Sequence, residues 1–478
     1  MIPPASRVHF VGIGGAGMSA LARVLLERGY RVSGCDLRAS ETTRRLAAAG
    51  IAVSLGHDPS HLDAADTVVA SRAVPEQSPE IVAARSRGMP VYHRAQLLAQ
   101  VLAEGCGIAV VGTHGKTTTA AMITHVLAAG GRDPTALIGA DVDGLDGNVR
   151  LGRGPWVVAE VDESDGSLLY VRPHAAVVTS LDTTDHRDYY RTAERLVETF
   201  ARFVAQLPDD GFAVLCTDFP YVRDLRPRVR ARVLTCGLSG RPDLRAEIQA
   251  LAGGRTRCVF IREGRRLGPV TLAVPGRYNV RNALAAAAVG LAAGVEFDRI
   301  AQALQAFGGV SRRFAVRGDV GGVMVVDDYA HNPVKVAAVL RAARESWPDR
   351  RVIAVFQPHR YTRTRTTYRR FATAFADADE LIITELYPAD EPPIPGVSAS
   401  LIVNAIRPHR PVTFLPDPAG VVEHLLEVVR PGDLVLTLGA GDIGRVADAL
   451  VAALRAGRAS AGGASSGRGG PGGREGER

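Results

Sequence analysis

The sequence predicts an α/β protein of three domains, each built on a largely parallel sheet. Three times along the chain an apolar strand leads into a loop and a helical stretch, and strands that alternate with helices are typical of parallel sheets. The chain of 478 residues is also long enough for about three domains. We expect these domains at residues 1–104, 105–312 and 313–456, followed by a disordered Gly/Ser/Arg tail at 457–478.

The individual elements follow from apolar runs and from the loops between them. In the first domain, a strand from Val8 to Ile13 precedes a helix that runs to Arg28. In the second, a strand at 108–111 precedes a helix that runs through Ala129, and another strand covers 175–179. The third is expected to hold a helix from Pro333 and strands at 322–326, 352–356, 381–384 and 434–438.

Composition excludes several classes of protein. Hydrophobic residues make up 46% and charged residues 22% of the chain, which excludes a coiled-coil, collagen-like or mainly disordered protein. The net charge is +7, but the basic residues are spread along the chain. Of the 57 basic residues only Lys116 and Lys335 are lysines, a preference for arginine that resembles codon bias. We therefore expect no nucleic-acid partner.

Cysteine usage and apolar runs indicate the compartment. The five cysteines are scattered without a CxxC pair, which is typical of reduced thiols and not of a disulfide framework or a zinc site. The start of the chain has no charged segment followed by an apolar one, and the longest apolar run, Ala283–Val295, is too short to span a membrane. We expect a soluble, cytoplasmic protein.

A glycine-rich loop follows the first expected strand. Gly12, Gly14 and Gly17 open a helix there, and Asp36 follows the next expected strand. In such an arrangement the backbone N–H groups at the helix N-terminus hold a diphosphate. Taken alone, the motif favours a dehydrogenase, but it requires only a diphosphate and a ribose, so a UDP-sugar fits equally well.

A second loop, Gly112-Thr-His-Gly-Lys116-Thr117, lies between a strand and a helix. Its backbone donors can wrap a phosphate, Lys116 can meet the outer phosphates, and the Thr117 hydroxyl can bind Mg²⁺. The loop is a shortened form of the usual phosphate-binding pattern. A compact ammonium fits a narrow phosphate loop better than a guanidinium does, which explains a lysine in a chain that otherwise uses arginine. The alternative is an ordinary surface turn.

Acidic residues follow the next expected strand, at Glu160, Asp162, Glu163 and Asp165. An acid at the carboxyl end of a strand, beside a phosphate loop, is well placed to bind Mg²⁺. A solvated acidic loop is the alternative. His186, which follows another apolar strand, becomes a candidate metal ligand in this company.

Asn279 and Asn282 stand three residues apart at the start of an Ala-rich helix. They share a helix face, and their amides can pair with the edge of an adenine. For Asn279, a role in starting the helix is an equal alternative.

Two expected strand ends of the third domain carry polar side chains, at 327–333 and 356–365. Because strand ends in one sheet converge, these segments bring an acid, a tyrosine, histidines and several arginines together. Arginine binds carboxylates through two parallel hydrogen bonds. Such a site can hold an amino acid by its carboxylate.

In combination these segments resemble the Mur ligases, the ATP-dependent amide-forming enzymes of peptidoglycan synthesis, and among them the alanine-adding branch. The resemblance covers Val8 to Leu454, and its most specific segments are HFVGIGGAGMS, GTHGKTTT, AEVDESDGS, DDYAHNP, FQPHRYTRTR and ELYPADEPPIPG. It implies a Rossmann-like N-terminal domain for a UDP-sugar, a central P-loop ATPase domain, and a Rossmann-like C-terminal domain for the amino acid.

The resemblance also implies roles for the residues that match the family's motifs. Contacts to the UDP-sugar are expected from Gly14, Gly15, Ala16, Gly17, Met18, Asp36, Ser71 and Arg94. Contacts to ATP are expected from Gly112, Thr113, His114, Gly115, Lys116, Thr117, Thr118, Asn279, Asn282, Arg313 and Asp328. The incoming amino acid is expected at Tyr329, His331, Arg360 and Arg363.

The cofactor and the catalytic residues are implied in the same way. Mg²⁺, for which Mn²⁺ can substitute, is expected at Thr117, Glu160 and His186. The residues expected to take part in catalysis are Lys116, Glu160, His186, Arg360 and Arg363.

The implied substrates are UDP-N-acetylmuramate and L-alanine. The lactyl carboxylate attacks the γ-phosphate of ATP and gives an acyl phosphate, and the amine of L-alanine then displaces phosphate. The protein's part is positioning and charge neutralisation. The expected state is a monomer or a weak homodimer.

Two features depart from the family's pattern or distinguish its branches. The usual T-N-x-x-x-D-H segment reads Thr-Ser-Leu-Asp-Thr-Thr-Asp-His at 179–186, with Ser180 in place of asparagine and one extra residue. Other Mur ligases carry a carbamylated lysine near a second metal, for which the central domain has no lysine apart from Lys116.

Three alternative functions stay open at this point. The first is a murein-recycling ligase of the same fold, which joins a preformed peptide, although its glycine loop usually differs from GIGGAGM. The second is a dehydrogenase, which rests on the first glycine loop alone. The third is a non-catalytic nucleotide-binding regulator, which explains the two loops but not the metal ligands and the arginine-rich site together.

Overall fold

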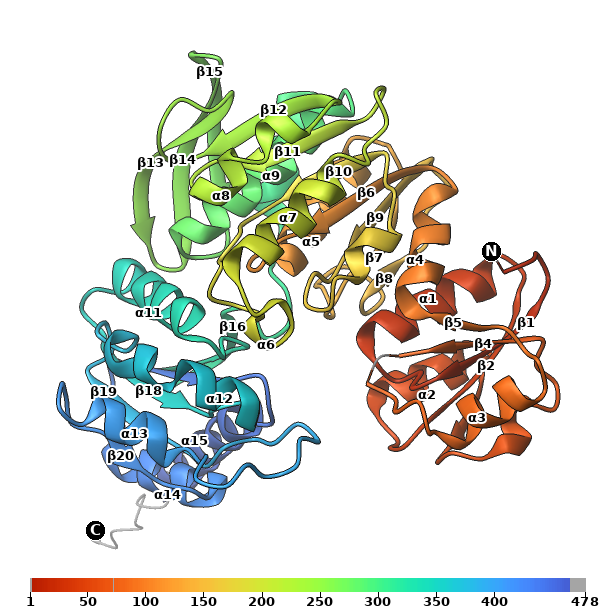
Figure 1. Ribbon diagram of the computed structural model, residues 1–478. Coiled ribbons are helices and arrows are strands. Elements are labelled where there is room, and N and C mark those ends of the chain that lie inside the picture. The colour runs from red at the N-terminus through yellow and green to blue at the C-terminus, as the bar shows by residue number, and fades with distance from the viewer. Residues whose placement is uncertain (1, 72, 465–478) are drawn as a thin grey trace, which may run out of the picture. The chain divides into compact units, whose positions relative to one another are not determined.

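The computed structural model describes residues 2–71 and 73–464, which form two compact units (Figure 1). The first unit ends at Ser311 and the second begins at Arg312. The first unit holds a five-stranded and a ten-stranded sheet, and the second holds a six-stranded sheet. Helices connect the mostly parallel strands of all three, so the α/β class predicted from the sequence is confirmed.

The N-terminal sheet is parallel throughout, in the order β3-β2-β1-β4-β5. Its strands are β1 (Arg7–Val11), β2 (Arg31–Asp36), β3 (Ala52–Leu55), β4 (Thr67–Ala70) and β5 (Val91–His93). The helices are α1 (Ala16–Glu27), α2 (Glu41–Ala48), the 3-10 helix η1 (Pro59–Leu62), α3 (Pro79–Ser86) and α4 (Arg94–Ala103). The strand order reverses between β1 and β4, and ligands of open α/β sheets bind outside the carboxyl ends of strands at such a point.

Strand β1 ends two residues earlier than the sequence analysis expects. The N–H groups of Gly12 and Ile13 both donate to the carbonyl of Cys35, at 2.9 and 3.0 Å, and so leave the strand ladder. Gly12 has a φ of 80°, a left-handed conformation that glycine adopts without strain. The chain therefore turns at the carboxyl end of β1 and enters α1 at Ala16.

The second sheet has the order β15-β14-β13-β12-β11-β10-β6-β9-β7-β8. Its strands are β6 (Cys106–Val111), β7 (Thr135–Leu137), β8 (Val149–Arg150), β9 (Trp156–Glu160), β10 (Ala175–Val178), β11 (Phe212–Cys216), β12 (Arg232–Gly237), β13 (Leu244–Ala252), β14 (Arg255–Arg262) and β15 (Arg265–Leu272). The helices are α5 (Lys116–Ala129), η2 (Ser167–Tyr170), α6 (Arg187–Tyr190), α7 (Ala193–Val204), α8 (Pro220–Arg223), η3 (Arg226–Arg228), α9 (Arg277–Ala292) and α10 (Phe297–Ala306).

Strand β6 is apolar along its length because both faces of the sheet are covered. Ile108 and Val110 join the core that contains α5, α9 and α10, whereas Ala109 and Val111 join the core on the other face. Each fully buried valine or isoleucine contributes roughly 1.5–3 kcal/mol. The Ala-rich helix α9 comes close to α5, because a Cβ at Gly290 would lie 2.5 Å from a methyl group of Val126. The apolar run noted in the sequence is therefore a buried helix.

The edge strands β13, β14 and β15 form an antiparallel meander that the sequence analysis did not identify. Turns at Gly253–Gly254 and at Glu263–Gly264 connect them, with positive φ at all four residues. Glycine pairs between strand-forming segments are a hairpin signal.

The sheet of the second unit has the order β16-β17-β21-β18-β19-β20, parallel except for the β16–β17 pair. Its strands are β16 (Ala315–Val320), β17 (Val323–Asp328), β18 (Arg351–Phe356), β19 (Glu380–Ile383), β20 (Thr413–Phe414) and β21 (Asp433–Leu438). The helices are α11 (Pro333–Ser346), α12 (Tyr361–Thr367), η4 (Tyr368–Thr373), α13 (Ser400–Ile406), α14 (Pro418–Val428) and α15 (Gly444–Ala464). Two apolar cores cover its two faces, one with α11 and α13 and the other with α14 and α15.

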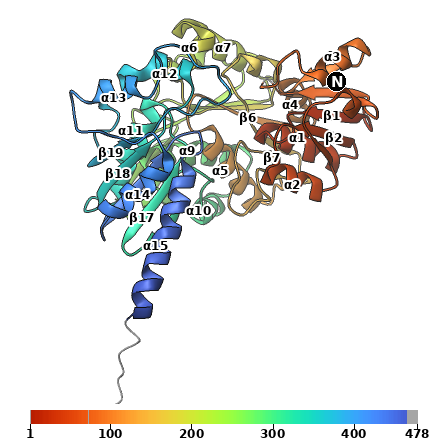
Figure 2. The same ribbon diagram turned by 90° about the horizontal axis from the view of Figure 1, so that it is seen from below.

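The last helix extends into the segment from Gly457 on that the sequence predicts to be a tail. Helix α15 continues through 457–464 and extends beyond the rest of the second unit (Figure 2). Adding a residue to an existing helix is far easier than nucleating a new one, and alanine and arginine are strong helix formers. The remainder of the expected tail, 465–478, lies outside the described residues.

Two further findings concern the expectations from composition. All five cysteines are free thiols. Within the described residues, no helix has the length and apolar character needed to cross a membrane.

Two glycines of the second unit should respond oppositely to replacement by alanine. A Cβ at Gly441 would lie 2.5 Å from Cγ of Tyr387, so Gly441→Ala should lower the free energy of unfolding by about 1–3 kcal/mol. Gly420, in α14, has no neighbouring atom within 4 Å of the added Cβ, so Gly420→Ala should raise it by about 0.4–1 kcal/mol. Urea unfolding of the two variants beside the wild type checks both signs, and an equal effect of the two would contradict the packing argument.

Candidate active site

The loop between β6 and α5 has the geometry of a phosphate-binding loop. Gly112 and Gly115 have φ values of 129° and 82°, and Gly115 is the N-cap of α5. A Cβ at Gly112 would lie 2.3 Å from Oγ1 of Thr179, and one at Gly115 would lie 2.6 Å from Oδ1 of Asn282. The loop therefore requires glycine at both positions, and its backbone N–H groups gather at a helix N-terminus, where anions bind.

The ammonium of Lys116 lies among oxygen atoms. Its Nζ donates to the carbonyl of Gly112 at 2.7 Å and to the two carboxylate oxygens of Glu163 at 2.9 and 2.8 Å. Burial alone lowers the pKa of Lys116, but the carboxylates of Glu163 and its neighbours outweigh burial and hold that pKa above its usual value. Lys116 is therefore charged, with the inward-facing Glu163 as its counter-ion.

His186 shares the same carboxylate. Its Nε2 lies 2.9 Å from Oε1 of Glu163, and the hydroxyl of Tyr190 donates to the Glu163 carbonyl. Burial lowers the pKa of His186. The hydrogen bond to Glu163 and the charge of Asp185 raise this pKa by more than burial lowers it, so the net shift is upward. The predicted metal ligand His186 therefore meets Glu163 and not Glu160 in this state.

The other two predicted metal ligands lie together. Oγ1 of Thr117 donates to Oε2 of Glu160 at 2.9 Å, and the N–H of Gly139 donates to the same oxygen at 3.1 Å. Glu160 ends β9, which pairs with β6, so the sheet places it beside the loop. A hydroxyl and a carboxylate are hard oxygen donors of the kind that Mg²⁺ prefers.

Ser180, where the family has asparagine, supports the loop from the β10 side. Its hydroxyl accepts from the N–H of His114 at 2.8 Å and lies 3.1 Å from Oγ1 of Thr113. Thr179 adds a bond from its hydroxyl to the His114 carbonyl at 2.6 Å, and Asp182 lies 3.1 Å from Nε2 of the same histidine. The departure from the family's pattern thus coincides with a hydrogen-bonded contact between β10 and the loop.

Asn279 and Asn282 are both buried and bonded to each other, with Nδ2 of Asn282 donating to Oδ1 of Asn279 at 3.1 Å. Asn279 also donates to the carbonyl of Pro275 at 2.7 Å, and Asn282 accepts from the hydroxyl of Thr119 at 3.2 Å. None of these bonds caps α9, whose N-cap is Gly276 without a side-chain cap bond, so both roles considered for Asn279 stay predictions. The bonds also place Asn282 directly against Gly115 of the loop.

The N-terminal glycine loop gathers the residues predicted to bind the UDP-sugar. Oδ2 of Asp36 accepts from the N–H of Gly14 at 2.9 Å, so this acid fixes the loop. A Cβ at Gly17 would lie 2.6 Å from Nη1 of Arg94, and one at Gly12 would lie 3.4 Å from Cβ of Ser71. Ala16 and Gly17 are the first residues of α1, whose N–H groups have no acceptor within a helix.

In the second unit, Asp328 orders the loop that carries Arg313. Its carboxylate accepts from the N–H groups of Phe314 and Ala330, both at 2.7 Å. Burial raises the pKa of Asp328 to about 6 despite the nearby charge of Arg313. The guanidinium carbon of Arg313 lies 4.9 Å from the centre of the Tyr329 ring. Asp328 is almost fully enclosed, so we interpret it as a positioning residue.

The residues predicted to surround the amino acid form an aromatic and cationic cluster. The ring of His331 lies 5.3 Å from Tyr329 and 5.9 Å from His359, and His359 stacks on Tyr387 at 5.7 Å. Nη1 of Arg363 lies 3.0 Å from Nδ1 of His359.

Both imidazoles of this cluster are neutral. Burial, assisted by the charge of Arg363, lowers the pKa of His359 to about 3 and that of His331 well below its usual value. Arg360, in contrast, is 44% exposed, and its Nε lies 4.0 Å from a carboxylate oxygen of Glu391.

Three residues of these sites have no distinct role in the prediction from the sequence: Asp182, Tyr387 and Glu163. Glu163 was one of four acids without a distinct role, and only the fold shows that it meets Lys116. Asp182 and Tyr387 lie in the segments 179–186 and ELYPADEPPIPG, but neither residue was singled out, because a motif does not show which of its side chains reaches the site.

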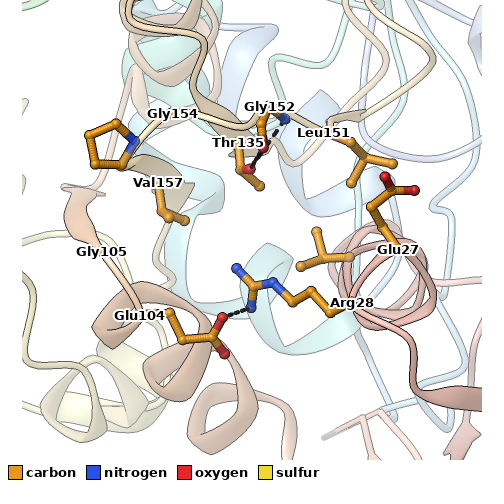
Figure 3. Close-up of a pocket in the computed structure, with 11 residues that line it drawn as sticks. Glu27, Arg28, Glu104, Gly105, Thr135, Leu151, Gly152, Gly154 and Val157 are labelled. Carbon is orange, nitrogen blue, oxygen red and sulfur yellow. Dashed lines mark hydrogen bonds and ion pairs between the residues drawn. The ribbon is translucent and has the colours of Figure 1, made fainter. Parts of the chain in front are cut away.

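A cavity of about 170 Å³ in the first unit lies apart from the predicted residues (Figure 3). An ion pair between Arg28 and Glu104, at 2.5 Å, lies on its wall. Thr135, Leu151 and Val157 line it further. Because no residue of the glycine loops lines this cavity, it does not add to the candidate site.

The phosphate loop with its partly buried lysine, and the carboxylate and hydroxyl beside it, define a nucleotide-phosphate-binding enzyme of the α/β class. Comparison with known proteins identifies the family. Residues 7–105 match the Mur ligase family catalytic domain, 110–290 the Mur ligase middle domain, and 312–441 the Mur ligase glutamate ligase domain. The chain belongs to the Mur ligase family of ATP-dependent ligases.

Individual relatives agree with this assignment. A UDP-N-acetylmuramate–L-alanine ligase of Geobacter sulfurreducens is 47% identical over 95% of this chain and 98% of its own. The crystal structure of UDP-N-acetylmuramate–alanine ligase from Thermotoga maritima matches with a TM-score of 0.81 and 29% identity, over 95% of this chain and 100% of its own. A murein peptide ligase from Psychrobacter arcticus has the same fold, with a TM-score of 0.70 and 24% identity over 94% of this chain and 98% of its own.

The neutral histidines of the second unit predict a loss of stability in acid. Below the unfolded-state pKa of about 6.5, the unfolded chain binds protons that folded His331 and His359 exclude, so the free energy of unfolding falls as the pH falls. Each histidine contributes a slope of about 1.4 kcal/mol per pH unit, which for His359 continues down to its folded pKa of about 3. His359→Gln should reduce the pH dependence of the free energy of unfolding by about 1.4 kcal/mol per pH unit.

Urea unfolding, followed by tryptophan fluorescence from about pH 4 to about pH 7, measures this slope. The chain has two tryptophans, so a Trp156→Phe background leaves Trp347 of the second unit as the reporter. His424→Gln, on α14, is the matched control. Equal slopes in the His359→Gln and wild-type proteins would contradict the assignment.

Proposed function

We propose that this protein joins L-alanine to the lactyl carboxylate of UDP-N-acetylmuramate, with conversion of ATP to ADP and phosphate, in peptidoglycan precursor synthesis. The observation that carries the proposal is the phosphate loop with its partly buried Lys116, in a chain that is 47% identical to a UDP-N-acetylmuramate–L-alanine ligase. The reaction takes place in the cytoplasm, on small-molecule substrates, and the protein acts as a monomer or weak homodimer.

The central domain activates the carboxylate. Lys116 and the N–H groups of the loop bind the ATP phosphates, and when they do, the ammonium exchanges Glu163 for phosphate oxygens. Thr117 and Glu160 would hold Mg²⁺, with His186 as a further ligand, and the hydroxyl and carboxylate oxygens fit that ion. Mg²⁺ bound there would supply neutralisation of charge on the transferring phosphoryl group. Mn²⁺ fits the same donors.

Positioning of the carboxylate is the work of the N-terminal domain. The helix N-terminus at Ala16 and Gly17 binds the diphosphate of the UDP-sugar, and Arg94 adds a positive charge beside it. Ser71 lies at the end of the neighbouring strand β4, on the rim of the same crevice. Asp36 acts mainly through the loop, because its carboxylate already holds the N–H of Gly14.

The C-terminal domain supplies the amine. Arg363 and Arg360 bind the carboxylate of L-alanine, and Tyr329 and His331 line its surroundings. His331 is neutral, so it leaves the positive charge of the site to the arginines. After attack by the amine on the acyl phosphate, phosphate leaves and the amide remains. Arg313 and Asn282 contribute to the nucleotide site, and Asp328 holds Arg313 in place.

Release of inorganic phosphate tests the proposal. The assay contains ATP, Mg²⁺ and UDP-N-acetylmuramate, with L-alanine, glycine, L-serine or a meso-diaminopimelate-containing tripeptide as separate acceptors. Release should require both the UDP-sugar and L-alanine. Lys116→Ala should lower kcat by about 10²–10³-fold, because a preorganised positive charge on the phosphoryl group is lost.

Arg299→Ala removes an exposed cation from α10 of the first unit and is the matched control, with activity near that of the wild type. Release with the tripeptide alone would reassign the protein to murein recycling. Silence with every acceptor, despite ATP binding, would leave a non-catalytic nucleotide-binding regulator.

A further inference from the structure

Five side chains with ligand atoms suited to a metal meet inside the N-terminal domain, and none of them belongs to the glycine loop. They come from β1, β2, the loop after β3, η1 and α3, and we call them the histidine–cysteine cluster: His9, Cys35, His57, His61 and Glu80. His9, Cys35 and Glu80 are buried, and the side chains of His57 and His61 are each 16% exposed. The cluster is thus mostly enclosed, and its partial exposure lies at His57 and His61.

The distances within the cluster match a tetrahedral metal site. Sγ of Cys35 lies 3.6 Å from Nδ1 of His57 and 3.2 Å from Oε1 of Glu80, and these last two atoms are 3.0 Å apart. Zinc bonds of about 2.0–2.3 Å at tetrahedral angles place ligand atoms about 3.3–3.6 Å from one another. These three atoms therefore form nearly one face of such a tetrahedron.

A histidine can supply the fourth corner. Nδ1 of His61 lies 3.3 Å from the same oxygen of Glu80. Ligand atoms of His9, Cys35 and His61 also lie within 4.8 Å of one another. Either His61 or His9 can thus complete the coordination, without a change in the order of the elements.

His9 provides an independent indication of a ligand. It is 1% exposed, and among the described residues its Nε2 has no hydrogen-bond partner. Nδ1 lies 2.9 Å from the hydroxyl of Ser33, which can accept a hydrogen bond from Nδ1–H. In that tautomer Nε2 carries the free lone pair. A buried imidazole nitrogen without a partner is costly, and a metal ion would satisfy it.

Hydrogen bonds alone do not account well for the cluster. One oxygen, Oε1 of Glu80, is the shared neighbour of Cys35, His57, His61 and the N–H of Asp58. A carboxylate oxygen offers about two lone-pair sites. The crowding of four groups on one oxygen indicates that a small cation belongs between them.

From this geometry we propose that the histidine–cysteine cluster is a binding site for a divalent transition-metal ion, with zinc as the preferred ion. Sulfur and imidazole nitrogen are ligands that zinc selects and that Mg²⁺ does not. A thiolate from Cys35 and a carboxylate from Glu80 balance the charge of +2, so the buried site is neutral overall when the histidines are neutral. On binding, the Sγ–H proton leaves to solvent as the Zn–S bond forms, without any redox change.

A metal ion in this site would stabilise the carboxyl ends of the strands next to the glycine loop. The Cys35 carbonyl already accepts from Gly12 and Ile13, and the next residue, Asp36, holds Gly14. A metal on Sγ of Cys35 would join this strand end to η1 and α3. The role is structural, because protein ligands alone can fill all four positions.

Metal binding by the full chain tests the proposal independently of activity. The protein is stripped with a chelator, and Zn²⁺ is titrated against a chromophoric chelator in excess Mg²⁺, which occupies the oxygen-donor site. Co²⁺ is added in a second titration, because cobalt bound to a thiolate gives a charge-transfer band. One Zn²⁺ per chain and a cobalt–thiolate band are expected.

Variants assign the site to the cluster. Cys35→Ser should abolish the cobalt band and weaken zinc binding by at least about tenfold. Loss of a residue that only hydrogen-bonds a metal ligand already weakens metal binding by about tenfold or more, and loss of a ligand should cost at least as much. His57→Gln should weaken zinc binding similarly. Cys106→Ser, at the far end of β6, is the matched control and should bind as the wild type does. Absence of the band in the wild type, or equal zinc affinity in Cys35→Ser, would overturn the proposal.

Discussion

The ion pair between Lys116 and Glu163 is the interaction on which the candidate active site depends. An ammonium enclosed by protein needs a negative partner, since a lone buried charge costs several kcal/mol. Glu163 meets this need with both oxygens, from a segment that follows the strand beside β6. The strand order therefore sets the electrostatics of the loop: β9 brings the acids to one side, and β10 brings Ser180 to the other.

Much of this arrangement could be predicted from the sequence because it is local. The strands β6, β10, β17, β18, β19 and β21 lie within about two residues of their expected limits, since buried parallel strands are continuous apolar runs. The two glycine loops were identified because a turn between strand and helix requires glycine at fixed positions. Thr117 and Glu160 could be predicted to lie close together, because the carboxyl ends of neighbouring parallel strands meet at one edge of the sheet.

The rest depends on contacts between distant segments, which spacing does not encode. Four acids in six residues look alike until β9 is in place, and then Glu160 meets Thr117 whereas Glu163 meets Lys116. Asp36 was predicted to contact the UDP-sugar, and only the folded chain shows that its carboxylate also fixes Gly14. The meander β13–β15 lies at the edge of its sheet, where half-exposed strands carry charged residues and resemble loops.

The first unit thus contains two donor sets of opposite character, one on each of its sheets. Thr117 and Glu160 offer oxygen, joined by one nitrogen of His186 in the proposed site, whereas Cys35 with its histidines offers sulfur and nitrogen. Hard cations such as Mg²⁺ bind oxygen and keep several waters, and zinc favours the softer, drier set. The burial of Cys35 and His9 strengthens this division, because a hydrated Mg²⁺ ion does not fit where a bare ion must be held by protein atoms alone. The same physical property, the polarisability of the donor atom, would therefore keep a catalytic ion and a structural ion apart within one unit.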